Sequence, residues 1–256
     1  MFDWLRRRRE PRPIPEALWR GVLEQYPFLA ARPQAEAGRL RQLAAAFLAH
    51  KEFHGAQGFV ITDAVALAIA AQAVLPVLSL GLHWYDDFVG IVVHADQVVA
   101  RRTVAGDDGV VHDYEEVIAG EAMDRGPIML SWKDVEPSPA HVESGFNVVI
   151  HEFIHKIDLR DGAADGCPPL RSRAARATWM ETMTREYEGF REKVIIAERF
   201  GGDAPWLDRY AAEAIDEFFP VACEAYFVNR ARFEREFPAL TALFDSFFRA
   251  NAAAGS

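Results

Sequence analysis

The stretch 148–158, Val-Val-Ile-His-Glu-Phe-Ile-His-Lys-Ile-Asp, constrains this chain more than any other. It places His151, Glu152 and His155 in the pattern H-E-x-x-H. Residues four apart lie on one face of a helix, so both imidazoles can reach one metal ion. The adjacent carboxylate can then reach a water on that ion without binding the metal. Zinc peptidases have this arrangement, so the sequence predicts zinc-activated water with Glu152 as general base.

The neighbours of the motif are mostly apolar, as a buried zinc helix requires: Val148, Val149, Ile150, Phe153, Ile154 and Ile157. Lys156 is the exception, because it places a charge where such motifs usually carry an uncharged residue. A lysine is compatible with the motif if that face of the helix reaches solvent. The competing interpretation of the stretch is an ordinary buried helix with two histidines.

Length and composition indicate one large domain. The chain has 256 residues, 50% of them hydrophobic, which is enough to bury one sizeable core. Its formal charge of −10 argues against direct binding of nucleic acid. The two cysteines, Cys167 and Cys223, form no C-x-x-C pattern. A disulfide framework is therefore not expected, and a cytoplasmic location fits.

The basic N-terminus is expected to be a flexible, solvated arm. Arginines at 6–9 and 12 are combined with prolines at 11, 13 and 15, so no secretory signal is expected after the initial Met. Contact of this arm with an anionic partner or a membrane is the minority interpretation. We predict an arm over 1–13, a peptidase domain over 14–250 and a flexible tail over 251–256.

The segment 64–82 is long enough to span a bilayer and contains no charged residue. However, Gln72 and Pro76 interrupt it, and much of its content is alanine, which is weakly apolar and favours helices. We interpret it as a buried core helix, capped by Thr62 or Asp63 and broken near Pro76. No membrane association is expected.

The remaining patterns predict a mostly helical, zincin-like α+β fold with a small β-sheet before the H-E-x-x-H helix. Further helices are expected over 15–26, 35–54 and 173–199, and at the end of the chain around Leu240 to Phe248. Strands are expected at 90–94 and 97–103, as a hairpin or meander, and at 128–132, with a turn at 106–109.

His50 and His54 are also four apart, but they do not repeat the metal pattern. Glu52 lies two positions from each histidine, so on a helix it points to the far side and cannot act as their base. We interpret these residues as the end of the second helix.

A catalytic zinc ion needs a third protein ligand and an open position for water. The extended metzincin pattern is absent, because positions 158 and 161 are both aspartate and no histidine follows His155. The third ligand is then most simply an acid on a later helix, as in glutamate-type zincins. Spacing and apolar neighbours favour Glu217, then Glu224, and leave Glu213 and Asp216 open.

Several stretches, in order along nearly the whole chain, carry a resemblance to a known family: Lys51-x-Phe53-x-Gly55-Ala56-x-Gly58, Ile69-Ala-Ala-Gln-Ala73, Asn147-Val-Val-Ile-His-Glu-Phe-x-His-Lys-x-Asp158, Asp165-Gly166, and Tyr210-Ala-Ala-x(4)-Glu217-Phe-Phe-x-Val-x-x-Glu224-x-Tyr-Phe227. The chain resembles the Mlc titration factor A (MtfA) family, also called DgsA anti-repressors, which are zinc-dependent peptidases. The resemblance implies one zinc ion per chain on His151, His155 and Glu217, Glu152 as general base, and Tyr210 as oxyanion stabiliser.

The chain departs from the family pattern just before the implied ligand Glu217. Ile215-Asp216 stands where the family usually has Pro-Ala, and Pro220 follows three residues after the glutamate. Asp216 can serve as a helix N-cap, which would place Pro220 in the first turn, where its missing N–H is harmless.

The resemblance implies aminopeptidase-like activity on small peptides. Two other functions compete with it: a protein-binding regulator that sequesters a transcriptional repressor, for which the family is named, and an inactive zinc-fold scaffold. The intact Glu152 argues against the scaffold. Three supporting roles stay open at this point. Asp158 or Asn147 can accept the second N–H of a zinc-bound histidine or merely bond at a helix end, and strand 128–132 can align substrate as an edge strand or be plain core.

Overall fold

The computed structural model describes residues 10–105, 111–118, 120–122 and 126–249. Most of the predicted arm, the predicted tail and the turn predicted at 106–109 lie outside the described residues.

The first elements of the described chain are three helices, α1 (Glu16–Gln25), α2 (Pro27–Ala30) and α3 (Gln34–His50). Helix α1 ends at Gln25, close to the predicted end at residue 26, and Pro27 supplies the first residue of α2. The prediction of a helix through residue 54 is wrong. Helix α3 ends at His50, and the backbone of β1 (Glu52–Gly55) is extended. His50 and His54 therefore do not share a helical face.

Helix α4 (Asp63–Ala73) is the buried helix predicted from the apolar segment. The Thr62 hydroxyl accepts a hydrogen bond from the Val65 N–H at 3.2 Å, which confirms Thr62 as the N-cap. The helix ends before Pro76, and η2 (Leu82–Tyr85) follows. Within the part of the chain that the structure describes, no helix combines the length and apolarity needed to cross a bilayer.

The small sheet has four strands in the order β1-β2-β6-β5. Strands β1, β2 (Gly90–His94) and β6 (Ile128–Ser131) are parallel, and β5 (Gly120–Ala122) runs antiparallel to β6 at one edge. Strands β3 (Val98–Ala105) and β4 (Val111–Ile118) pair only with each other in the described chain. The strands predicted at 90–94 and 97–103 are both present, but their expected pairing in a hairpin or meander is wrong, because β2 pairs in parallel with strands distant in sequence.

Two short helices, α5 (Trp132–Val135) and α6 (Pro139–Ser144), lead to α7 (Val148–Asp158), which carries the H-E-x-x-H motif. The turn η3 (Leu159–Asp161) follows, and then the long helix α8 (Arg173–Phe200). The buried residues of α8 recur at helical spacing on one side of the helix: Trp179, Met183, Phe190 and Val194. Gly201 ends α8 with φ 74°, a backbone conformation that favours glycine.

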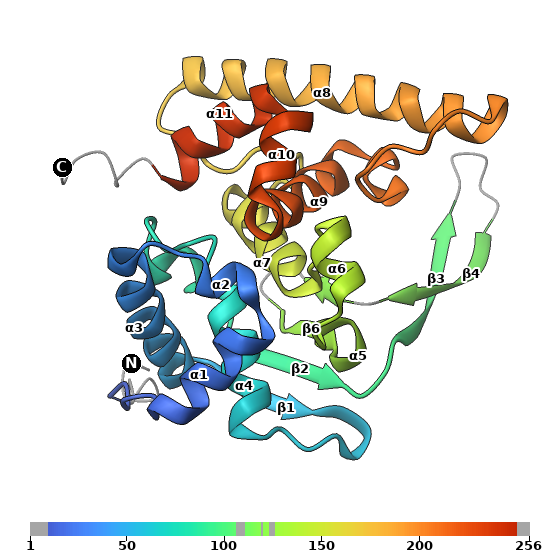
Figure 1. The fold of residues 1–256 in the computed structure, drawn as a ribbon. Helices are drawn as coiled ribbons and strands as arrows, with labels where there is room; N and C mark the ends of the chain where they lie inside the picture. The colour runs from blue at the N-terminus through green and yellow to red at the C-terminus, as the bar shows by residue number, and fades with distance from the viewer. Residues whose placement is uncertain (1–9, 106–110, 119, 123–125, 250–256) are drawn as a thin grey trace, which may run out of the picture.

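The last part of the chain comprises η4 (Arg209–Ala212), α9 (Ile215–Val228), α10 (Arg230–Glu236) and α11 (Pro238–Phe248). Figure 1 shows α8 to α11 above, α1 to α4 and the sheet below, and α7 between the two groups. Two aromatic clusters fill these layers. Phe153 of α7 packs on Phe47 and Tyr85 below, and Trp179 of α8 packs on Phe219 and Phe244 above.

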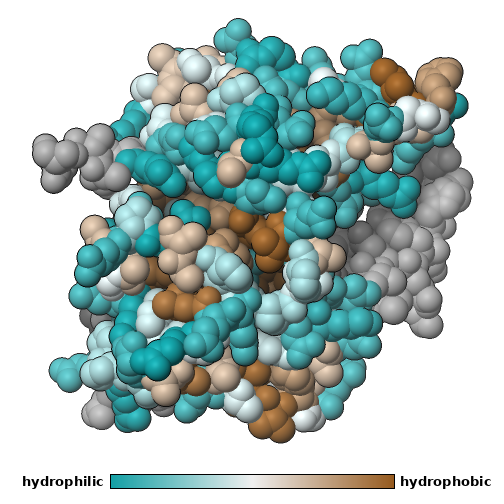
Figure 2. Space-filling view, in the orientation of Figure 1, coloured by the Kyte–Doolittle hydropathy of each residue, from teal (hydrophilic) through white to brown (hydrophobic). Residues whose placement is uncertain are grey.

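The predicted fold class is confirmed: the chain is mostly helical, with a small sheet ahead of the H-E-x-x-H helix. Most of the surface in Figure 2 is hydrophilic, and hydrophobic side chains gather in the hollow at its centre. Figure 2 also shows hydrophobic surface at the carboxyl end of α8, where Ile195, Ile196 and Phe200 are exposed.

Candidate metal centre

Helix α7 is fixed at its start by Asn147, its N-cap. The Asn147 side-chain oxygen accepts the Ile150 N–H at 2.8 Å, and its amide nitrogen donates to the Gln72 side-chain oxygen of α4 at 2.6 Å. Asn147 thus caps the helix and does not contact a histidine ring in these hydrogen bonds. Of its two predicted roles, the structure shows the helix-end one.

The two motif histidines lie one turn apart on α7 and point the same nitrogen at the same place. The Nε2 atoms of His151 and His155 are 3.1 Å apart, and the side chains are 13% and 14% exposed. Two imidazole nitrogens this close, partly open to solvent, can bind one cation together.

Glu217, the third residue of α9, completes a triangle with this pair. Its Oε2 atom lies 3.3 Å from the Nε2 atoms of both His151 and His155. With zinc–ligand distances of about 2.0–2.1 Å, tetrahedral ligands would be about 3.3–3.4 Å apart, so the triangle has the dimensions of a zinc site. Among the described residues, these three are the group of side chains that can hold a metal ion.

The electrostatics of the triangle also suit a cation. Glu217 Oε2 is buried and has no hydrogen-bond donor of good geometry among the described residues. Burial acts to raise the pKa of Glu217, but the contacts with His151 and His155 outweigh burial and lower it. An ionised oxygen facing two imidazoles fits a metal ion, so the donor set and its dimensions agree.

Glu224 was the other main candidate for the third ligand, but it contacts the nitrogen of the His151 ring that faces away from the triangle. Its Oε1 atom lies 2.8 Å from Nδ1 of His151, and its Oε2 atom accepts a short hydrogen bond from the Asn147 backbone N–H. Burial raises the pKa of Glu224, against the lowering effect of His151. The acceptor for the second nitrogen of His151 is thus Glu224, a role that the sequence had indicated for other residues.

Asp158 was the other sequence-based candidate for that acceptor. Its carboxylate instead accepts the backbone N–H groups of Gly166 and Cys167, both at 2.9 Å. Burial raises its pKa to about 7 in spite of these two bonds. Asp158 therefore holds the loop that follows α7. Of its two predicted roles, the structure shows hydrogen bonding at the helix end.

Glu152 lies beside the triangle on α7 and is only 4% exposed. Its Oε2 atom is buried and has no hydrogen-bond partner within the described residues. Burial raises the pKa of Glu152, although the nearby His151 and His155 act to lower it. A buried carboxyl group with a raised pKa next to a metal site can exchange a proton with a reacting group.

Tyr210 also lies beside His151, although it is 59 residues further along the chain. It belongs to η4, where the Asp208 side chain accepts its backbone N–H at 2.9 Å. Its half-buried ring is 6.2 Å from the ring of His151, between centroids. The structure therefore brings together all five residues predicted for the site: His151, Glu152, His155, Tyr210 and Glu217.

The start of α9 differs from the prediction. Ala214 is the N-cap and Asp216 the second helical residue, so Asp216 does not cap the helix. Pro220 lies inside the helix and not in its first turn. Because Pro220 has no N–H, it cannot bond back to the Asp216 carbonyl. What supports the helix start is the loop below it, where an added Cβ on Gly166 would lie 2.8 Å from the Ile215 carbonyl oxygen.

The environment of Lys156 on α7 differs from the prediction. The condition that its face reaches solvent is not met, because Lys156 is 0% exposed. Its ammonium group donates to the Gly126 carbonyl at 3.1 Å and lies 5.0 Å from the centre of the Phe88 ring. A buried lysine is tolerated because hydrogen bonding and a cation–π contact replace water.

The strand predicted at 128–132, which was considered as an edge strand for aligning substrate, corresponds to β6 and is not an edge strand. It pairs with β2 on one side and β5 on the other, so its backbone is already bonded on both sides. Among the described strands, the edge on this side of the sheet is β5, antiparallel to its neighbour. Strand β6 therefore has no free edge on which an extended peptide could pair, and of its two predicted roles the structure shows the core strand.

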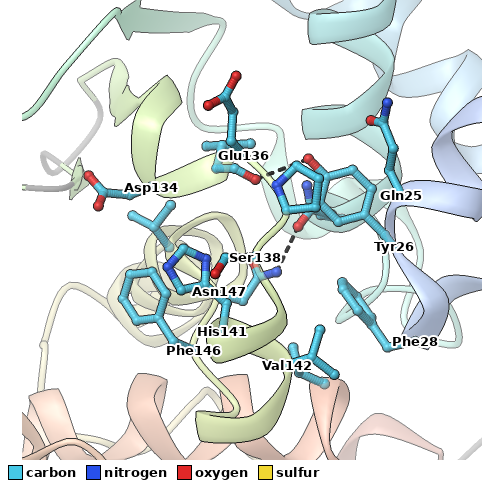
Figure 3. A pocket seen from close by; sticks show the side chains of 15 residues that line it. Gln25, Tyr26, Phe28, Asp134, Glu136, Ser138, His141, Val142, Phe146 and Asn147 are labelled. Atoms are coloured by element: carbon cyan, nitrogen blue, oxygen red, sulfur yellow. Dashed lines mark hydrogen bonds between the residues drawn. The ribbon is translucent and has the colours of Figure 1, made fainter.

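A small pocket of about 20 Å³ lies on the other side of Asn147, between α6 and the N-terminal helices. Figure 3 shows the Asn147 amide bonded to Gln72 and the Tyr26 hydroxyl bonded to the Val135 carbonyl across it. The rings of His141 and Phe146 lie in its wall with their centroids 4.9 Å apart and their planes tilted by 58°. The pocket lining contains none of the five site residues, so the metal triangle lies outside this pocket.

A small sheet ahead of an H-E-x-x-H helix, with a glutamate from a later helix beside both histidines, defines a metallopeptidase of the zincin class. The chain matches the family described as glucose-regulated metallo-peptidase M90 over residues 1–249. It belongs to that family.

Full-length relatives agree with this assignment. The chain is 32% identical over 250 residues to a protein named Mlc titration factor A from Yersinia enterocolitica, covering 97% of this chain and 91% of the relative. It is 31% identical to proteins of the same name from Yersinia pestis and Yersinia pseudotuberculosis, over 97% of this chain and 90% of each relative. The predicted resemblance to the Mlc titration factor A family is confirmed.

Proposed function

We propose that this chain is a zinc-dependent peptidase that binds one zinc ion on His151, His155 and Glu217. The observation that carries the proposal is the triangle of two imidazole nitrogens and one carboxylate oxygen, 3.1–3.3 Å apart. Bound there, zinc would act as a Lewis acid on the scissile carbonyl and lower the pKa of a water molecule. Membership of a metallopeptidase family supports the same reaction class.

The chain's own residues carry the proton and the developing charge. Glu152 is buried, and its Oε2 atom has no hydrogen-bond partner in the described chain, so this carboxylate takes the proton of the attacking water and gives it to the leaving amine. Its raised pKa makes it a stronger base than an exposed glutamate. The ring of Tyr210 lies beside the ring of His151, and the Tyr210 hydroxyl donates a hydrogen bond to the oxygen on which negative charge develops.

The aminopeptidase-like preference for small peptides rests on the resemblance to the MtfA family. It is tested by comparing peptides with free and acetylated N-termini across a series of lengths. Faster cleavage of short peptides with a free amine supports the preference, whereas equal rates on both series contradict it.

The general-base role of Glu152 is tested with Glu152→Gln. Loss of the base should reduce kcat by at least about a hundredfold, because an amide cannot accept the proton. Zinc content, measured by metal analysis of the purified variant, should stay at one ion per chain, since Glu152 is not in the triangle. A variant that hydrolyses peptides at the original rate would refute this mechanism.

We also propose a second function, the binding of a transcriptional repressor protein in the cytoplasm. Relatives that align with 97% of this chain carry the name Mlc titration factor A, and both cysteines here are buried free thiols, as suits a reducing compartment. A purified repressor of this type should be retained by Glu152→Gln as well as by the unmodified chain. If neither retains it, the peptidase function stands alone.

A further inference from the structure

Glu224 stands behind the metal triangle and is almost completely buried, with 2% of its surface exposed. It lies seven residues after Glu217 on α9. At about 100° per residue, seven residues make nearly two full turns, so both glutamates project from one face of the helix. Both glutamates accordingly contact His151: Glu217 lies at the Nε2 atom of the ring and Glu224 at the Nδ1 atom.

We propose that Glu224 is a positioning residue for metal binding: it accepts the Nδ1–H of His151 and so turns the Nε2 lone pair of that ring toward Glu217 and His155. The inference rests on the proposed function and assigns a role to a further residue of the same site. An imidazole that donates one N–H to a carboxylate is fixed in tautomer and orientation and is a better metal ligand.

The second oxygen of Glu224 extends this positioning to the start of α7. It accepts the backbone N–H of Asn147, the residue whose side chain caps the helix and bonds to Gln72 of α4. Figure 3 shows that anchoring bond at the edge of the small pocket. A single carboxylate on α9 therefore connects the ring of His151, the first turn of α7 and, through Asn147, helix α4.

This arrangement also accounts for a buried acid at that position. An unpaired carboxylate out of contact with water would cost several kcal/mol, so both oxygens need donors. A ring N–H and a backbone N–H supply them. An apolar side chain of the same volume would fill the space but would leave Nδ1 and the Asn147 N–H without an acceptor.

The test compares zinc affinity in Glu224→Ala and Glu224→Gln, measured by competition with a chelator on the full chain. Loss of a carboxylate behind a ligating histidine typically weakens metal binding by about 10- to 100-fold, which we expect for Glu224→Ala. The zinc affinity of Glu224→Gln should lie between those of the unmodified chain and Glu224→Ala. Its amide oxygen can still accept the hydrogen bond from Nδ1 of His151, but its NH₂ group cannot accept one from the Asn147 N–H. The visible spectrum of the cobalt-substituted chain should shift in the same order.

Tyr226→Phe is the matched control, since it also removes a hydrogen bond from α9. The Tyr226 hydroxyl donates to Asp245 at 2.7 Å, away from the triangle. This variant should melt at a lower temperature yet bind zinc as tightly as the unmodified chain. If Glu224→Ala fails to fold, Glu224→Gln decides: weakened affinity with an altered cobalt spectrum supports the proposal.

Two outcomes would overturn the proposal, and they can be told apart. Unchanged zinc affinity in folded Glu224 variants, while the unmodified chain binds zinc, overturns the positioning role alone. Failure of the unmodified chain to bind zinc overturns the proposed function together with this inference.

Discussion

Helices α7 and α9 both supply ligands to the metal triangle, but the positions of these ligands are fixed in different ways. On α7 the distance between the two histidine nitrogens follows from one turn of helix, with Asn147 capping its start. On α9 the position of Glu217 depends on how the whole helix packs. Its first residue, Ile215, rests on Gly166, and Ala225 near its other end rests on Gly145.

The contrast shows which part of the site is vulnerable. The histidine pair survives as long as α7 is helical, whereas a small displacement of α9 moves the carboxylate away from both rings. Close contacts at Gly166 and Gly145 leave no room for even one methyl group, because an added Cβ would lie 2.8 and 2.9 Å from backbone atoms of α9. We therefore expect metal affinity to respond to changes at either end of α9.

The largest effect is expected from removing the α9 donor itself. Glu217→Ala should weaken zinc binding by more than the roughly hundredfold upper range for an outer acceptor, and should abolish peptide hydrolysis. Isothermal titration with zinc and a peptide cleavage assay measure both. The neighbouring Asp216→Ala is the control, since Asp216 lies outside the triangle and should keep both properties. If Asp216→Ala loses zinc and Glu217→Ala keeps it, the assignment on α9 is wrong.

The same contrast explains how much of the molecule could be predicted from sequence. Helical periodicity is local, so the inward residues of α8 and the motif on α7 follow from spacing alone. Glu217 and Glu224 could not be separated in this way, because both have apolar neighbours and share one helical face. Their roles differ only in which nitrogen of His151 each one meets.

The errors likewise occur where distant segments decide the outcome. Neighbouring strands were expected to pair, but β2 pairs in parallel with β1 and β6, from before and well after it in sequence. The acceptors for the ammonium group of Lys156 include the Gly126 carbonyl, 30 residues away, so no local pattern announces that this lysine can be buried. The start of α9 at Ile215 depends on its contact with Gly166.

A smaller effect, on turnover alone, is expected at Tyr210. It belongs to η4, the turn that precedes α9, and lies beside His151 but outside the triangle. Tyr210→Phe should lower kcat by about a hundredfold through loss of one donor to the developing negative charge, with zinc content unchanged. Tyr187→Phe is the control, because its hydroxyl bonds to the Ala212 carbonyl of the same turn. Equal losses of zinc and turnover in Tyr210→Phe would contradict the assignment.

The smallest effect on zinc binding is expected from a change at Gly166, which contacts the start of α9. Comparison with Gly162 separates the effect of packing from that of backbone strain. Gly166 has φ 75°, and its added Cβ would meet the Ile215 carbonyl oxygen, whereas Gly162 has φ 91° and open space around it. Both Gly→Ala changes should lower the unfolding free energy by about 1–3 kcal/mol, because alanine is strained at positive φ.

Only Gly166→Ala should also weaken zinc binding, by about tenfold, since it alone pushes the start of α9 away from the histidines. Chemical denaturation of the metal-free chain and chelator competition measure the two effects separately. Equal zinc affinities in the two variants would mean that α9 tolerates the displacement. In that case Glu217 would be held as locally as the histidines of α7, and the contrast between the two helices would fail.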